Sequence, residues 1–372
     1  MIEMKTAAPR PLHRLGIVME PDPGNLREAE GVLNPAVTRG PDGQLYLLPR
    51  LVAPGNYSRI GLARVIFDRH NTPVGVERLG MALEPQEPYE LNAQTGGGVE
   101  DPRITYLAER SLYVMTYTAF GPDGPRIAAA VSRDLMQWHR TGLVEFAPLH
   151  GLDLARVDNK DAVLFPEPIP APDGRLALGL IHRPAFPRAW LAGEHALPGR
   201  PSIWLSYAPL DEIAAGKGIV FGQHHLLAAP QQSWEQLKVG GGAPPVRVDD
   251  GWLLVYHGVS GRIVPGVDQQ QGVRYCAGML LLDGQDPRQV CYRSAQSILA
   301  PRMEEECEGV VPRVVFPTGV DTWADGTLDV YYGMADSRIG VARGHLAALP
   351  GSAVARAPYA PPPAAYAPAL AA

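Results

Sequence analysis

The stretch NPAVTRGPDGQLYLLPRLVAPGNYSRIG, residues 34–61, contains the three elements that decide the fold. A short apolar run with a β-branched centre is followed by an Asp-Gly turn and a second apolar run, and a third run begins at residues 59–61. The same three elements recur five times in this order, with first elements 59 to 83 residues apart. The first elements are Asn34–Val37, Asp101–Ile104, Lys160–Val163, Ala243–Val246 and Val311–Val314.

Similar turns separate the runs in every copy. Four copies carry Asp-Gly, at residues 42, 173, 250 and 325, and the remaining copy carries Glu109-Arg110-Ser111. Asp-Gly between strand-like runs is typical of a β-hairpin, because a type I′ turn needs positive φ at both central residues. Each copy is therefore expected to be an antiparallel meander. Five such units predict an all-β, five-bladed β-propeller with a central funnel, and a β-sandwich with chance Asp-Gly turns is the alternative.

The composition agrees with a globular chain of short elements. Of the 372 residues, 40 are glycine and 38 are proline, which disfavours long helices. The formal net charge of −6 argues against a basic nucleic-acid binder, and no apolar stretch is long enough to span a membrane. The start of the sequence has no apolar segment of a secretory signal, which predicts a cytoplasmic protein. The three cysteines lack metal-ligand spacing, so neither a metal nor an organic cofactor is expected.

The repeats also bear on domain organisation. Length alone would allow two or three domains. Because the five units account for residues from about 30 to 348, a single propeller domain over residues 1–350 is the better interpretation. Residues 351–372 are rich in alanine and proline and are expected to form a disordered tail.

Aligned residues at one end of the first strands of a propeller are neighbours in space, so the repeats predict a site. The residues three positions before the β-branched residue are Asn34, Asp101, Lys160, Ala243 and Val311. Three of these are polar where scaffolding alone would leave small or apolar side chains. The ends of the second strands add Arg50, Tyr117, His182, Arg183, His257 and Tyr332. Arginine, lysine and histidine with few carboxylates predict an anion pocket, bordered by glycine runs at 96–98 and 240–242.

Motif-like segments are distributed over all five units. They are Gly98–Arg103, Ser132–Leu135 with Trp138 and Arg140, Asn159–Asp161 leading to Leu164–Glu167, His182–Pro184, Gly242–Pro245 with Tyr256–Gly258, and Tyr331–Gly333 followed by Asp336. In combination these segments resemble family 130 of the glycoside hydrolases. The resemblance implies a five-bladed propeller and, for most members, an inverting phosphorylase of β-mannosides that releases α-mannose 1-phosphate. A minority of the family hydrolyses β-mannosides.

The resemblance implies roles for the matching residues. Asp101 would be the general acid, acting on the glycosidic oxygen through the 3-hydroxyl of the sugar. The phosphate-binding residues would be Arg140, Lys160, Lys238 and His257. Asn34, Arg50, Arg64 and Asp336 would hold the mannosyl ring. Tyr117, Arg183 and Tyr332, which the repeat alignment places near the same region, are further candidate substrate-binding residues. Two positions depart from the family pattern: Lys160 stands where arginine is usual, which weakens bidentate phosphate binding, and Arg313 stands where a small polar amide is expected.

Two reactions remain open, and the charge opposite the acid distinguishes them. An inverting phosphorylase needs one acid and a set of cations, because phosphate itself is the nucleophile. An inverting hydrolase needs a second carboxylate about 6.5–9.5 Å away to activate water. Lys238 and His257 favour phosphorolysis, whereas Glu308 or Asp336 could be the hydrolytic base. A non-catalytic carbohydrate- or protein-binding propeller is a third, more remote alternative.

The expected partners follow from this interpretation. They are a β-mannoside or manno-oligosaccharide and, as co-substrate, inorganic phosphate. Binding to nucleic acid or to a membrane is not expected. The loops around residues 185–201 and 263–272 would shape the acceptor side, and a homo-oligomer is compatible with the sequence.

Overall fold

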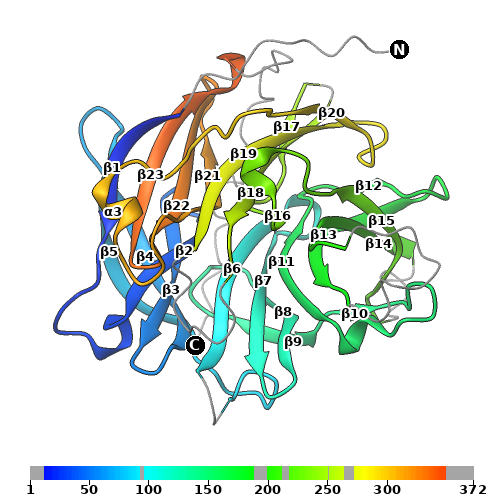
Figure 1. The fold of residues 1–372 in the computed structure, drawn as a ribbon, viewed down its shortest axis with the longest axis horizontal. Helices are drawn as coiled ribbons and strands as arrows, with labels where there is room; N and C mark the ends of the chain where they lie inside the picture. The colour runs from blue at the N-terminus through cyan, green and yellow to red at the C-terminus, as the bar shows by residue number, and fades with distance from the viewer. Residues whose placement is uncertain are drawn as a thin grey trace, which may run out of the picture.

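The computed structural model describes residues 12–92, 96–187, 199–211, 218–249, 251–263 and 272–348, so the proposed tail lies outside the described residues. Figure 1 shows strands grouped around a common centre, with β2, β6, β11 and β16 near it. The described chain is mainly β-strand, which confirms the all-β prediction. Its helical elements are α3 (Glu304–Cys307) and the 3₁₀ turns η1 (Leu26–Glu28), η2 (Ala108–Arg110), η3 (Leu154–Arg156), η4 (Ser233–Glu235) and η5 (Leu346–Ala348), and Leu210 and Asp211 are helical as well. None of these helices is long and apolar enough to cross a membrane.

Antiparallel pairing groups most strands into successive meanders. The first meander consists of β2 (Gly31–Arg39), β3 (Leu45–Ala53), β4 (Tyr57–Phe67) and β5 (Pro73–Leu83). The second consists of β6 (Gly97–Leu107), β7 (Leu112–Gly121), β8 (Gly124–Ser132) and β9 (His139–Leu143). The third consists of β11 (Asp158–Leu164), β13 (Leu176–Ala185), β14 (Ile203–Pro209) and β15 (Val220–Ala228), with the short strands β10 (Glu145–Phe146) and β12 (Ile169–Pro170) at its margins.

The last two meanders complete the ring of sheets. The fourth consists of β16 (Lys238–Gly241), β17 (Val246–Val248), β18 (Gly251–Gly261), β19 (Val273–Asp283) and β20 (Val290–Arg293). The fifth consists of β21 (Val315–Thr322), β22 (Thr327–Met334), β23 (Arg338–His345) and the N-terminal strand β1 (His13–Met19). Because β1 pairs antiparallel with β23, strands from the two ends of the described chain close this meander. A short parallel pairing of β4 with β6 joins the first two meanders into one eight-stranded sheet.

The first strands of the meanders contact one another. Strand β2 packs against β6 and β21, β6 packs against β11, and β11 packs against β16. A cavity of about 320 Å³ is lined by residues near the starts of these strands, and a second cavity of about 340 Å³ by residues near their other ends. The inner strands therefore run from one cavity to the other.

The Asp-Gly hairpins form with a turn different from the expected one. Gly43, Gly174 and Gly326 have positive φ, whereas the preceding aspartates do not, so these turns are not type I′. The Gly43 N–H donates to the carbonyl of Gly40, and Gly40 and Gln44 close the loop. This is a type I turn followed by a left-handed glycine, the usual three-residue hairpin loop. Asp250 of the fourth copy lies outside the described residues.

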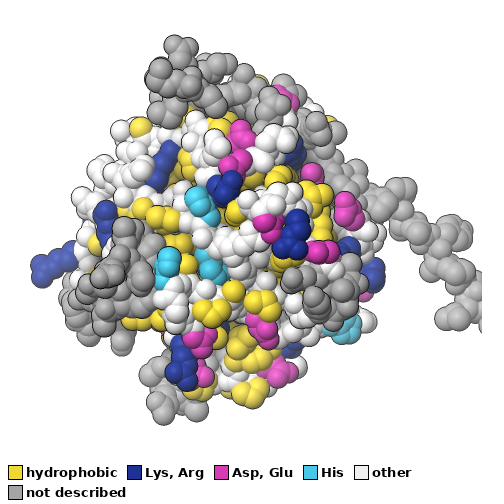
Figure 2. Space-filling view, turned by 90° about the vertical axis from the view of Figure 1, so that its right-hand side faces the viewer, with side chains coloured by type: hydrophobic (Ala, Val, Ile, Leu, Met, Phe, Trp, Pro, Cys, Tyr) yellow, Lys and Arg dark blue, Asp and Glu magenta, His cyan; other side chains and the backbone are white. Residues whose placement is uncertain are grey.

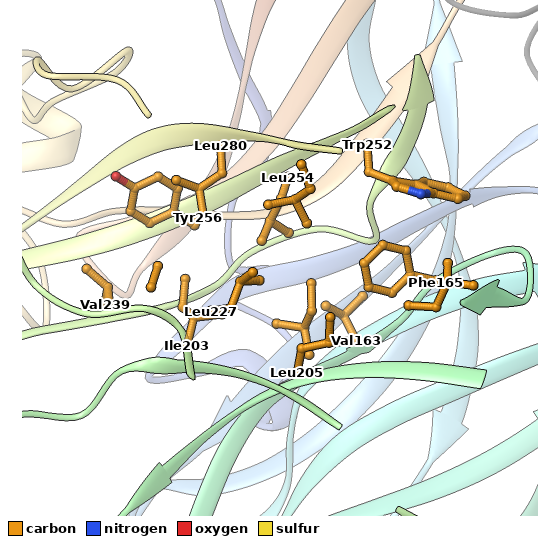
Figure 3. Packing of buried hydrophobic residues seen from close by; sticks show 14 of the residues in the cluster. Val163, Phe165, Ile203, Leu205, Leu227, Val239, Trp252, Leu254, Tyr256 and Leu280 are labelled. Atoms are coloured by element: carbon orange, nitrogen blue, oxygen red, sulfur yellow. The ribbon is translucent and has the colours of Figure 1, made fainter. Parts of the chain in front are cut away.

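The hydrophobic core lies between neighbouring sheets. Between the third and fourth meanders, Val163, Phe165 and Leu205 face Trp252 and Leu254, and all five are buried (Figure 3). The rings of Phe165 and Trp252 meet edge to face with centroids 5.1 Å apart. These apolar layers stabilise the ring by removing both sheet faces from water.

A buried glutamate in the connection before a meander binds two of that meander's strands. Glu90 accepts a hydrogen bond from the Tyr117 hydroxyl at 2.6 Å and one from Arg140 Nε at 2.8 Å. The same Glu–Tyr–Arg clamp recurs twice, as Glu235 with Tyr256 and Arg293, and as Glu306 with Tyr332 and Arg14. Through their tyrosines and arginines, the three clamps tie β7 to β9, β18 to β20 and β22 to β1.

The third meander replaces the clamp by a chain of neutral side chains. His182 Nε2 lies 2.7 Å from Ser206 Oγ, which lies 2.7 Å from His224 Nδ1, and His224 Nε2 lies 2.8 Å from the carbonyl oxygen of Ala147. Because only a protonated Nε2 can donate to that carbonyl, Ser206 donates to His224 and accepts from His182. Burial lowers the pKa of His182 and His224, which keeps both rings neutral.

On the face of the molecule drawn in Figure 2, the described residues form no continuous basic area. Figure 2 shows basic and acidic side chains interspersed with apolar ones. This pattern agrees with the small negative net charge.

Substitution of Glu235 by alanine is expected to lower the free energy of unfolding by about 3 kcal/mol, because Arg293 would stay largely buried without its partner. Urea unfolding followed by tryptophan fluorescence measures the change. The exposed Glu109→Ala is the control and should lie within about 0.5 kcal/mol of the wild type. Equal losses for the two variants would contradict a structural role of the clamp.

Candidate active site

Three inner strands contain a bulge whose first residue has left-handed backbone. The φ angles are 45° at Asn34, 48° at Asp101 and 57° at Asp161. At each bulge two residues of the inner strand oppose one residue of the neighbouring strand. A bulge of this kind bends the strand and redirects a side chain, and asparagine and aspartate tolerate positive φ better than most residues. All three side chains line the 320 Å³ cavity.

The bulges correct the sequence alignment of the third repeat by one residue. Asp161, not Lys160, is the structural equivalent of Asn34 and Asp101. Lys160 is instead equivalent to Glu100, because each precedes its bulge directly and pairs across the ladder. The β-branched residue used for the alignment follows three positions after Asn34 and Asp101. In the third repeat, Val163 follows only two positions after Asp161. The signal that could have placed Asp161 is the Asx residue itself, the side-chain type that a left-handed bulge favours.

Asp101 is held by an amide and a guanidinium. Asn34 Nδ2 donates to Asp101 Oδ1 at 2.8 Å, and Arg50 Nη1 donates to the same oxygen at 3.2 Å. Burial would raise the pKa of Asp101, but the cations of Arg50 and then Lys160 hold it below its ordinary value. Without a ligand, Asp101 is therefore ionised at neutral pH.

Glu100, which was not a predicted site residue, connects two of the predicted ones. Its Oε1 accepts from Arg50 Nη2 at 2.9 Å, and its Oε2 lies 3.2 Å from Lys160 Nζ. Its side chain is 2% exposed. These two ion pairs join residues of three different meanders, so the local sequence gives no sign of them.

Asp161 forms a second buried charge group with Arg183 and His257. Arg183 Nε donates to Asp161 Oδ2, and His257 Nε2 lies 3.6 Å from the same oxygen. Burial would raise the pKa of Asp161, but Arg183 and then His257 lower it. Gly240 lies under this group: a Cβ there would be 2.2 Å from Asp161 Oδ2 and 2.5 Å from His257 Cε1. Only glycine allows the backbone of β16 to approach so closely.

His257 and Lys238 face the cavity with free donors. The His257 side chain is fully buried, and neither ring nitrogen has a hydrogen-bond partner among the described residues. Burial lowers the pKa of His257 to about 3, with Asp161 opposing this, so the ring is neutral. Lys238 Nζ lies 5.3 Å from the centre of the Tyr275 ring and forms no ion pair within the described part of the chain. A buried imidazole without a partner points to a ligand that would bind it.

The cavity carries more carboxylates than the sequence suggested. Asp101, Asp158, Asp161 and Asp336 line it together with the cations of Arg50, Lys160, Arg183 and Lys238. The expectation of few carboxylates was therefore wrong. Burial raises the pKa of Asp336 to about 6, with Arg50 opposing this, so Asp336 and Asp101 lie in one cavity with pKa values shifted in opposite directions.

Six predicted site residues lie outside this cavity, and one of them, His182, belongs to the chain of neutral side chains in the third meander. Tyr117, Tyr332 and Arg140 belong to the Glu–Tyr–Arg clamps, where their polar atoms are already bound. Arg64 is paired with Glu77 on an exposed part of β4. Glu308 is exposed at the end of α3. The repeat alignment suggested the tyrosines and His182, the family resemblance suggested the two arginines, and the search for a hydrolytic base suggested Glu308. In the structure these residues stabilise the fold or lie on the surface. We therefore do not retain them.

The cavity at the other end of the inner strands is a weaker candidate. Its most polar pair, Arg39 and Asp321, is satisfied internally by an ion pair of 2.6 Å. The 320 Å³ cavity combines an acid, free cationic donors and an unbound imidazole. It is the candidate active site.

The family model described as beta-1,4-mannooligosaccharide phosphorylase matches residues 6–349. A 1,2-beta-oligomannan phosphorylase of Thermoanaerobacter sp. (strain X514) is 31% identical over 347 residues, 92% of this chain and 97% of the relative. The structure of the Listeria innocua beta-1,2-mannobiose phosphorylase with beta-1,2-mannobiose superposes with a TM-score of 0.67 at 23% identity, covering 90% of this chain and 96% of that one.

A further structure is described as coming from a family of mannoside phosphorylases that contains glycoside hydrolases targeting beta-1,2 mannosidic linkages. It superposes with a TM-score of 0.67 at 23% identity, covering 94% of this chain and 97% of that one. The chain belongs to glycoside hydrolase family 130, as the sequence segments indicated. It is an enzyme with the β-propeller fold of that family, which sets the β-sandwich aside.

Substitution of Gly240 by alanine is expected to reduce kcat/KM for the enzyme's glycoside at least about tenfold, because the methyl group displaces Asp161 and His257. The matched control is Gly75→Ala on β5, where the methyl group meets nothing within 4 Å. Steady-state kinetics on both variants, with circular dichroism to verify folding, make the comparison. A Gly240→Ala enzyme of wild-type activity would remove this group from the site.

Proposed function

We propose that the protein is an inverting phosphorylase that cleaves a β-mannoside with inorganic phosphate and yields α-mannose 1-phosphate. The observation that carries this proposal is the placement of Asp101 in one cavity with the unpaired Lys238 and the unbound imidazole of His257. The family and the names of the relatives support the reaction class. We further propose that the five meanders are five blades of a single domain over residues 1–350.

In the proposed reaction one bond breaks and one forms at the anomeric carbon. A phosphate oxygen attacks this carbon from the face opposite the leaving sugar, and the glycosidic oxygen leaves with the bonding electron pair. A proton from Asp101 reaches that oxygen through the 3-hydroxyl of the mannosyl ring, so that the acceptor sugar leaves neutral. No general base is needed, because phosphate is already the nucleophile.

The residues around the acid fall into two groups in this proposal. Asn34, Arg50 and Asp336 hold the mannosyl ring next to Asp101, and all three line the cavity. Lys160, Arg183, Lys238 and His257 bind phosphate, with Lys238 and neutral His257 as its direct donors. Lys160 binds phosphate as a point charge, and Arg183 is largely occupied by its ion pair with Asp161. The affinity for phosphate should therefore depend most on Lys238.

Hydrolysis is the second candidate, since Asp336 supplies a further carboxyl group in the same cavity. With a pKa of about 6, Asp336 would be ionised at neutral pH and could activate water. Incubation of the purified enzyme with β-1,2- and β-1,4-mannobiose, with and without phosphate, separates the two reactions. Mannose 1-phosphate formed only with phosphate supports phosphorolysis, and free mannose at equal rates in both conditions refutes it.

Replacement of Asp101 by asparagine is expected to lower kcat about 10²–10⁴-fold while the glycoside still binds, because the amide keeps the shape but cannot donate the proton. Calorimetric binding and turnover measured on the same preparation test this. Asp173→Asn, in an exposed hairpin turn, is the control and should keep full activity. Full turnover in Asp101→Asn would reject Asp101 as the acid.

Replacement of Lys238 by glutamine is expected to raise KM for phosphate about tenfold to a hundredfold, the loss of one charge-assisted hydrogen bond. The KM for the glycoside should change much less. Initial rates over a grid of both substrate concentrations measure the two constants. A rise confined to the glycoside KM would place Lys238 in the sugar subsite instead.

A further inference from the structure

Glu100 lies between the cation that holds the acid and a cation of the phosphate subsite. One carboxylate oxygen binds Arg50 at 2.9 Å, and the other lies 3.2 Å from Lys160. Arg50 in turn binds Asp101 at 3.2 Å. The four side chains form one buried chain in the order Lys160, Glu100, Arg50, Asp101, with alternating charge.

Glu100 and Asp101 compete for Arg50. Burial would lower the pKa of Arg50, but the carboxylates of Glu100 and then Asp101 raise it, so both stabilise its charge. Lys160 in turn competes with Arg50 for Glu100. An anion bound at Lys160 attracts the lysine ammonium and weakens its ion pair with Glu100. Glu100 then interacts more strongly with its other partner, Arg50. Arg50 and Lys160 then stabilise the Asp101 carboxylate less, and such a carboxyl group binds a proton more readily.

We propose that Glu100 is a positioning residue that couples the binding of phosphate to the uptake of a proton by Asp101. This inference rests on the proposed function and extends it. The proton that Asp101 later donates to the glycosidic oxygen comes from solvent when phosphate binds. The acid is therefore ready only when the nucleophile is present, which disfavours hydrolysis of the glycoside by water.

Several other charged or titratable groups face Asp101 or share its cavity. They are Arg50 on β3, Glu100 and Arg103 on β6, Asp158, Lys160 and Asp161 on β11, Arg183 on β13, Lys238 on β16, His257 on β18, Tyr275 on β19 and Asp336 after β22. Of these, His257 and Asp336 could also take up a proton beside an anion. The experiment must therefore assign the proton to Asp101.

The direct test counts protons taken up when an anion binds. Sulfate is the probe, because it exchanges no proton of its own between pH 5 and 7. Isothermal titration calorimetry in two buffers of different ionisation enthalpy gives the number of protons bound per sulfate. The wild type is expected to take up a substantial fraction of a proton. Asp101→Asn and Glu100→Gln should each remove most of that uptake while sulfate still binds.

Glu90→Gln is the matched control, because Glu90 is also a buried carboxylate bound to an arginine but lies in a clamp outside the cavity. It should lower stability and leave the proton count unchanged. If Glu100→Gln does not fold, Lys160→Gln breaks the same chain at its half-buried end and should also lower the count. Uptake that persists in Asp101→Asn, or that is unchanged in Glu100→Gln or Lys160→Gln, overturns the inference.

The pH profile of turnover supplies a second readout that a purely structural role would not move. The acid must be protonated, so the rate falls as pH rises through its pKa in the complex. Glu100→Gln leaves Arg50 to Asp101 alone and should move this alkaline limb about one unit toward lower pH. A lower rate with the limb unmoved contradicts the coupling. If wild-type enzyme binds neither phosphate nor sulfate, the proposed function fails too; if it binds sulfate without proton uptake, only the coupling fails.

Discussion

The left-handed residue in three of the inner strands is the constraint on which the site depends. A regular strand would alternate its side chains between the two faces of its sheet, and no residue would point along the axis of the ring. The bulges at Asn34, Asp101 and Asp161 break this alternation at equivalent places. They bring an amide and two carboxylates of three meanders into one cavity. Cations accompany them, because carboxylates at this depth must be paired.

The ring around this cavity is held by interactions that keep its sheets in place. The Glu–Tyr–Arg clamps tie β7 to β9, β18 to β20 and β22 to β1, and the connecting segment before each meander supplies the glutamate. In the third meander the chain from His182 through Ser206 to His224 ends on a backbone carbonyl of the connecting segment instead. Positioning of Lys160 and Arg183 on this meander therefore depends on two neutral histidines rather than on a buried ion pair.

Much of the fold could be predicted from the sequence, because short-range sequence features mark the repeat. Asp-Gly turns and β-branched runs are short-range features, and they mark the meanders even though the turn type differs from the expected one. Residues that line the candidate site were predictable where the repeat alignment was right, as at Asn34 and Asp101. At the third repeat a shift of one residue hid Asp161, since alignment by apolar residues cannot register a bulge.

The clamps explain the predicted residues that lie elsewhere. A clamp residue and a binding residue look alike in sequence, because both are polar side chains on a regular strand, as at Tyr117, Tyr332 and Arg140. Only the position of the buried glutamate distinguishes a clamp residue from a binding residue. Glu100 was not predicted as a site residue, because its two partners come from other strands, β3 and β11. Contacts between meanders cannot be read from the sequence of one strand.

The central claim is that Asp101 and an anion subsite face each other across one cavity. A crystal structure of the complex with a β-mannobiose and sulfate tests it most directly. The account predicts sulfate in contact with Lys238 and His257, on the side of the anomeric carbon opposite Asp101. Sulfate bound away from these residues, or a water molecule held by Asp336 at that position, would contradict it.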